Sequence, residues 1–406
     1  MAAGVNGKSA DRLTEMLRHC RNIFSSLPRA DQRHWAEVFV RGLLTVDGRK
    51  TIRKISDHVA GGGAEQCLQQ FVNQSTWQWH MVRRDLALLI AEAMEPKTWV
   101  IADIVIPKNG SNSVGVGRQF VYSEGRVVNC QFGIAVFLVG DKWSCPVNWR
   151  LPLPPSWDGD KDLRAKARLP DDEYSGPRWQ HMLDAIDEMT TDWGLVPAPV
   201  LVDVRSGLER ELNSLVRGLE ERYLEYALRV GANRPAATLA SARARPQTLS
   251  FAEFINESIT RNTAAHSRWG PPTSGGGRSQ LVAARLPTER SPAPTSRHRT
   301  GNSRRHAPRS AVQANQTPRS AAHRHVVGEW SPFRNYLRSI WLTSFDQSQL
   351  PSLPETVARL DLVAADLATL YDDLGLRHFE GRSYPGWHHY VTLISVAAAC
   401  KQLSSN

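Results

Sequence analysis

The chain has 406 residues, 41% of them hydrophobic, which predicts a large core divided between two or three domains. It contains no apolar run of about 18 residues and no secretory signal at its start, so neither a membrane-spanning nor a secreted protein is indicated. Its five cysteines are scattered and never spaced as C-x-x-C, which excludes a disulfide framework and a cysteine-based zinc site and fits a reducing cytoplasm.

Helices are predicted from residue 10 to residue 95, because apolar side chains recur there at helical spacing, as at Trp35, Val38 and Phe39. The glycines 61–63 interrupt this run and residues 94–97 end it. We interpret residues 1–95 as an N-terminal helical domain. It is a candidate for DNA binding, although it shows no helix-turn-helix pattern and a packed bundle is the alternative.

Residues 96–231 change to short apolar runs separated by turns, the first three of which suit an antiparallel meander. The predicted elements follow in the order strand, strand, strand, helix, strand, helix, strand: 99–106, 127–138, 143–151, 179–193, 198–203, 208–222 and 224–230. This is the order of the ribonuclease H fold, an α/β fold with a mixed five-stranded sheet and flanking helices. We therefore expect this region to be the first part of such a core.

Two aspartates end up on this sheet. Asp103 is the one carboxylate on its otherwise apolar strand, and Asp203 closes the fourth strand. A buried carboxylate is costly unless it is paired or binds a cation, which leaves a divalent metal and Lys108 as the alternative partners of Asp103. Because the first and fourth strands are neighbours in the ribonuclease H fold, the two aspartates are expected to face each other, which favours the metal.

Residues 232–325 are rich in Pro, Ser and Gly and contain 15 Arg, no Lys and 3 acidic residues, against a net charge of +10 for the whole chain. We expect a largely disordered insertion with one strand at 280–286. Its arginines can contact DNA phosphates, or they can reflect codon bias in a GC-rich genome. Residues 326–406 are predicted to complete the core with strands and two helices, the first capped by Gly375 and the second starting near Trp387.

Several motifs in a fixed order resemble those of the insertion-sequence DDE transposases, bacterial enzymes with a ribonuclease H-like catalytic core. The resemblance covers about residues 30–403, and its most specific parts lie near the C-terminus. The motifs span residues 99–110, 113–120, 128–133, 151–157, 374–383 and 386–393.

The resemblance implies two Asp and one Glu that hold two Mg²⁺ or Mn²⁺ ions for nicking and strand transfer. The first family Asp lies in an acidic pair followed by Thr, which is replaced here by Ala102, Asp103 and Ile104. If the ligand is the second member of the pair, it survives as Asp103; if it is the first, it is lost as Ala102. The second family Asp corresponds to Asp203.

The third position has lost its carboxylate. The family Glu lies eleven residues before the glycine that is Gly375 here, and this position holds Ala364, while a nearby family Lys is replaced by Tyr371. Alanine cannot bind a metal ion. Asp361, one turn earlier, is a candidate surrogate, and Asp366 lies nearby. The triad is therefore incomplete and enzyme activity stays an open question.

The resemblance also implies a partner and a location: DNA with the inverted repeats of an insertion element, a homodimer as a candidate assembly, and the bacterial cytoplasm in association with the nucleoid. The candidate DNA contacts are Lys108, Arg118, Arg382 and His388. Two functions stay open, namely cleavage and strand transfer at element ends, and non-catalytic DNA binding by a transposase-derived regulator. An unrelated α/β activity would leave the ordered motifs unexplained.

Overall fold

The computed structural model describes residues 3–236, 249–269, 279–286, 324–331 and 336–405. The chain divides into two compact units, Met1–Leu215 with Glu355–Asn406 and Val216–Pro354. The domain boundaries at residues 95, 231 and 325 stay predictions. The N-terminal helices belong to the same unit as the first strands and the C-terminal helices, because they pack directly on the last helix of the chain.

The first unit contains a mixed sheet whose strands follow the predicted order. Its strands are β1 (Thr98–Pro107), β2 (Val116–Val121), β3 (Arg126–Val139), β4 (Ser144–Arg150) and β5 (Val200–Asp203). β3 pairs antiparallel with β1, β2 and β4, while β1 pairs parallel with β5. This confirms the ribonuclease H-like α/β class. It also confirms that the first and fourth of the predicted strands, which are β1 and β5, are neighbours. β3 is buried without interruption from Cys130 to Val139, so both of its faces are covered there.

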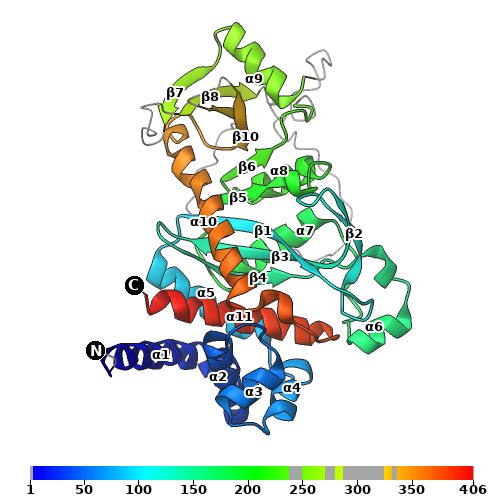
Figure 1. The fold of residues 1–406 in the computed structure, drawn as a ribbon. Helices are drawn as coiled ribbons and strands as arrows, with labels where there is room; N and C mark the ends of the chain where they lie inside the picture. The colour runs from blue at the N-terminus through cyan, green and yellow to red at the C-terminus, as the bar shows by residue number, and fades with distance from the viewer. Residues whose placement is uncertain (1–2, 237–248, 270–278, 287–323, 332–335, 406) are drawn as a thin grey trace, which may run out of the picture. The chain divides into compact units, whose positions relative to one another are not determined.

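Nine helices of the described chain belong wholly or mainly to this unit (Figure 1). They are α1 (Ala3–Ile23), α2 (Ala30–Thr45), α3 (Ile52–Val59), α4 (Glu65–Asn73), α5 (Trp79–Met94), α6 (Lys161–Ala167), α7 (Arg178–Asp187), α10 (Leu353–Asp372) and α11 (Tyr384–Leu403). α11 contacts α1, α2, α4, α5 and β4 and is buried from Gly386 to Cys400. It begins where Ser383 caps the Gly386 N–H, and Gly375 after α10 adopts the left-handed conformation expected of a helix end.

A buried arginine fixes the N-terminal helices to this core. Arg83 of α5 is 1% exposed, and its Nε donates to Thr392 Oγ1 at 2.8 Å. Its Nη1 donates to the Trp149 carbonyl at 3.0 Å, and its Nη2 donates to the His388 carbonyl at 3.2 Å. A buried guanidinium without partners would be costly, so this network favours one arrangement of α5, β4 and α11.

The second unit contains an antiparallel sheet in the order β6-β10-β9-β8-β7. Its strands are β6 (Tyr226–Val230), β7 (Ala265–Trp269), β8 (Ser279–Leu286), β9 (Arg324–Trp330) and β10 (Leu337–Thr343). β8 confirms the strand predicted at 280–286. α9 (Phe251–Thr260) and β7 were not predicted, whereas most of the expected disorder at 232–325 falls outside the described residues. α8 (Leu212–Glu221) spans the point at which the chain passes between the two units.

Among the described residues, no helix has both the length and the apolar character needed to cross a membrane.

Candidate acidic site

The structure brings Asp103 and Asp203 to neighbouring strands of the first unit. β1 and β5 run parallel, and their last paired residues are Ile101 and Val202. One hydroxyl links the two aspartates, because Ser206 Oγ donates both to Asp103 Oδ2 and to the Asp203 carbonyl at 3.0 Å. The two aspartates therefore lie on neighbouring strands, but this register, continued by one residue, places Asp203 beside Ala102 rather than Asp103, and each carboxylate already has a protein partner.

Asp103 forms an ion pair with an arginine at the start of α7. Arg178 Nη1 lies 3.0 Å from Asp103 Oδ2, with the two side chains only 18% and 10% exposed. The same guanidinium donates to the Ser206 carbonyl at 3.2 Å and lies 4.8 Å from the centre of the Phe132 ring. Among the described residues, Arg178 rather than Lys108 is thus the cationic partner of this carboxylate.

Burial dominates the electrostatics of Asp103. Loss of hydration raises the pKa of its carboxyl to about 6, because the opposing contributions of Arg178 and Ser206 are smaller. The negative charges of Asp203 and Glu211 raise this pKa further. The Oδ1 atom of Asp103 is buried and has no hydrogen-bond partner among the described residues.

Asp203 is more exposed and is paired with a residue close by in the chain. Its Oδ1 accepts from the main-chain N–H of Arg205 at 3.1 Å and from Arg205 Nε at 2.9 Å, while Oδ2 accepts from Nη2 at 2.7 Å. This bidentate contact raises the pKa of the guanidinium. The side chains of the pair are 43% and 32% exposed, so solvent competes with it.

A close backbone approach shapes the rim of the site at Gly207. This residue has φ of 108°, a region that favours glycine, and a Cβ here would lie 2.4 Å from the Tyr122 ring and 2.5 Å from Arg178 Nη2. Tyr122 is 52% exposed and its ring packs edge-on against Phe120 at 4.9 Å between centres. Two exposed aromatic rings therefore extend from the acidic site to the end of β2.

The third family position does not supply a carboxylate. Ala364 and Asp361 are both exposed on α10. Asp366 has a structural task instead, because its Oδ2 accepts from the Ser144 N–H at 2.8 Å and from Ser144 Oγ at 2.6 Å. Tyr371, at the family Lys position, places its hydroxyl 3.5 Å from the Val105 carbonyl.

These residues do not fit a two-metal site. Hard divalent ions need several converging oxygen ligands, and no three His, Cys, Asp or Glu side chains of the described chain converge in that way. The free Oδ1 of Asp103 is one suitable ligand atom, but its other oxygen and both oxygens of Asp203 are held by arginines. Glu211 accepts from the Trp179 N–H at 3.1 Å and does not complete the set.

The four candidate DNA contacts have different surroundings. Arg118 is exposed on β2, and Arg382 is exposed in the lining of a separate pocket. Both therefore stay candidates for contact with DNA. His388 is wrong as a DNA contact: it is 2% exposed, stacks on Trp79 at 4.7 Å, and lies 3.0 Å from the guanidinium of Arg83.

Lys108 is likewise engaged inside the protein. Its ammonium donates to the Phe379 carbonyl and lies 5.8 Å from the centre of the Phe379 ring. Burial lowers its pKa to about 8. Lys108 therefore connects the end of β1 to the segment that follows α10, and its contact with DNA stays a prediction.

Sequence reasoning missed Arg178, Ser206 and Glu211. The useful signal was Pro177, which marks a helix start and places the next residue in the first turn, but nothing in the sequence identifies Asp103 as the partner of that residue. The Ser206 hydroxyl was visible only as the Ser-Gly that replaces the family Tyr-Gly after Asp203. Its contact with Asp103 depends on the turn that follows β5.

A sheet with this strand order, and with one aspartate on each of two adjacent parallel strands, defines a ribonuclease H-like fold. The chain matches the family described as DDE superfamily endonuclease over residues 22–249, more than half of its length. It therefore belongs to this family of transposase-type endonucleases, whose chemistry typically depends on divalent metal ions. Comparison with curated proteins finds no match.

Proposed function

We propose that this protein is a transposase-derived DNA-binding protein that holds DNA without cutting it by the two-metal reaction. The observation that carries this proposal is the acidic site itself: Asp103 and Asp203 are paired with Arg178 and Arg205, and the third position is Ala364. DNA as the partner follows from membership of an endonuclease family and from the net charge of +10.

The charge balance argues against strong cation binding at this site. Two-metal cleavage needs a concentration of negative charge that offsets the cost of removing water from the ions. Here Arg178 and Arg205 neutralise two carboxylates, and a family Glu is absent at Ala364. Arg178 compensates the buried Asp103 carboxylate, which would be costly without a partner, so this carboxylate does not need a metal ion for its stability.

The DNA we propose is the end sequence of the insertion element from which the chain descends, bound by one chain or by a homodimer. A protein that binds such ends without cleaving them can occupy them against an active transposase, which is a regulatory role. Association with the nucleoid in the bacterial cytoplasm would follow.

The test combines binding and cleavage on one substrate. We expect the purified protein to bind duplexes taken from the genomic flanks of its own gene, measured by fluorescence anisotropy, and to leave them uncut in Mg²⁺ or Mn²⁺. Ala364→Glu restores the missing carboxylate and Asp203→Ala removes an existing one. Nicking by the unmodified protein that disappears in Asp203→Ala would overturn the absence of cleavage, and failure to bind any duplex would overturn the DNA-binding role.

A second candidate function is metal-dependent cleavage and strand transfer at element ends. One observation favours it: Asp103 Oδ1 is buried without a partner, as expected of an oxygen that awaits a ligand. Asp103→Asn keeps the shape of the side chain but lowers its value as a metal ligand. If the protein cleaves DNA and this variant does not, the second candidate replaces the first.

A further inference from the structure

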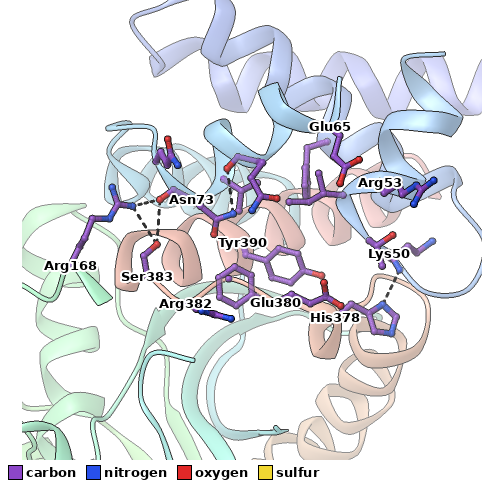
Figure 2. Close-up of a pocket in the computed structure, with 18 of the residues that line it drawn as sticks. Lys50, Arg53, Glu65, Asn73, Arg168, His378, Glu380, Arg382, Ser383 and Tyr390 are labelled. Carbon is purple, nitrogen blue, oxygen red and sulfur yellow. Dashed lines mark hydrogen bonds between the residues drawn. The ribbon is translucent and has the colours of Figure 1, made fainter. Parts of the chain in front are cut away.

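The first unit contains a cavity of about 890 Å³ that is lined by none of the residues of the acidic site. Its walls come from the start of α3, from α4, from the end of α6 and from the segment between α10 and α11 (Figure 2). Five of the residues that line it are cationic and two are anionic. The cationic residues are Lys50, Arg53, Lys166, Arg168 and Arg382, and the anionic ones are Glu65 and Glu380.

The excess of positive charge is not cancelled by internal ion pairs. Glu380 is paired with Arg49, a cation outside the lining, at 2.5 Å. Arg53, Lys166 and Arg382 are exposed and form no ion pair with a described residue. Arg168 and Arg382 lie on one side of the hollow and Arg53 on the other, so a ligand within it meets cations from opposite walls (Figure 2).

The pKa of a histidine in the cavity wall reflects the nearby positive charge. The pKa of His378, which lines the cavity, is lowered first by burial and then by the charges of Arg49 and Lys50. The main-chain N–H of Lys50 donates to His378 Nδ1 at 3.1 Å, a contact that requires this nitrogen to be unprotonated. Of these causes, the charges of Arg49 and Lys50 are the ones that also favour an added anion.

The backbone around the cavity is arranged to hold donors in place. Arg168 ends α6 at φ of 51°, a left-handed conformation that is uncommon for residues other than glycine. From there its guanidinium donates to the Asn73 carbonyl and to Ser383 Oγ, at 3.3 Å for the second contact. Across the cavity, Thr51 Oγ1 caps α3 by accepting from the Lys54 N–H at 3.2 Å, and the other first-turn N–H groups of this helix lack helical acceptors and favour an anion.

We propose that this cavity binds a backbone phosphate of DNA and so positions the duplex on the helical side of the first unit. The inference rests on the DNA-binding function proposed above and deepens it. Guanidinium groups suit phosphate because their planar donors match two of its oxygens. An anchor of this kind is independent of sequence and of metal ions, so a chain without a complete triad can retain it.

The experiment measures the salt dependence of binding to a 30-base-pair duplex of arbitrary sequence by fluorescence anisotropy. The test variants are Arg53→Ala and Arg382→Ala, and the matched control is Arg84→Ala, which removes one exposed arginine of α5 outside the cavity. Each lost phosphate contact should reduce the slope of log K against log salt by about 0.9. We expect each test variant to bind roughly tenfold more weakly, and the control to match the unmodified protein.

Two results would overturn this assignment. Unchanged affinity and slope in Arg53→Ala and Arg382→Ala would remove the cavity from the DNA-binding surface. An equal loss of affinity in Arg84→Ala would show that the effect comes from the change in net charge alone. Titration with inorganic pyrophosphate, followed by calorimetry, distinguishes the source of the phosphate. If pyrophosphate binds and this binding needs Arg382, while no duplex binds, the ligand of the cavity is a free phosphate compound. The absence of duplex binding would separately refute the proposed function.

Discussion

Removal of Arg178 should destabilise the protein by an amount that depends on pH. In Arg178→Met the Asp103 carboxyl loses the cation that lies 3.0 Å from it, while the methionine retains apolar contact with the Phe132 ring. A buried carboxylate left unpaired can avoid most of the penalty by taking up a proton. The penalty is therefore limited by the free energy needed to keep the carboxyl protonated at the pH of the experiment.

The magnitude follows from the pKa of about 6 for the Asp103 carboxyl, which exceeds the ordinary value of 3.8. A group with a raised folded-state pKa stabilises the fold at low pH, and this contribution is lost as the pH rises through about 6. Without Arg178 the pKa rises further, so the electrostatic cost reaches at most about 1.4 kcal/mol at pH 7 and about 2.7 kcal/mol at pH 8. Loss of the donors to the Ser206 carbonyl adds about 1–2 kcal/mol at any pH.

Urea unfolding followed by tryptophan fluorescence tests this from pH 5 to pH 8. We expect the variant to lose about 1–2 kcal/mol at pH 5 and about 3–5 kcal/mol at pH 8. The control is Arg205→Met, whose partner Asp203 is 32% exposed, and which should cost about 0–1 kcal/mol at every pH. A loss in Arg178→Met that is the same at pH 5 and pH 8 would refute the burial of an ionised Asp103.

Two further changes test the architecture of the first unit. Gly207→Ala should destabilise the fold by roughly 1–3 kcal/mol, because its Cβ would overlap Tyr122 at positive φ. The control is Gly159→Ala, whose Cβ would meet no atom within 4 Å. Thermal unfolding compares the two variants, and equal midpoints would contradict the close approach at Gly207. Asp366→Ala should cost about 1–3 kcal/mol because two donors of Ser144 lose their acceptor, while Asp361→Ala should stay within about 0.5 kcal/mol by the same measurement. A larger loss at Asp361 would give that residue a structural partner that the described chain does not show.

The strands of the core could be predicted because their signal is local. Runs such as 99–106 and 127–138 are apolar and β-branched, and they become β1 and β3 within one residue at each end. β2 was missed because it is short and contains Gly117, and its identity as a strand depends on hydrogen bonds to β3. α9 was missed although Ser250 and Glu253 form a capping box that is visible in the sequence.

The candidate site could be predicted only in part. The neighbourhood of Asp103 and Asp203 followed from strand order, which is a property of the fold. The partner of Asp103 did not follow from strand order, because Arg178 is 75 residues away in the chain and reaches Asp103 only through the packing of α7. The motif around His388 suggested an accessible polar residue. Because α11 is deeply buried, the imidazole of His388 packs in the core instead.

The most direct test of the account is nicking of a supercoiled plasmid that carries the gene with its own genomic flanks. The unmodified protein is incubated with this plasmid in Mg²⁺ and in Mn²⁺, beside Asp203→Ala as the background. We expect retarded plasmid with no nicking above that background in either metal. Metal-dependent open circles that form with the unmodified protein and vanish in Asp203→Ala would contradict it.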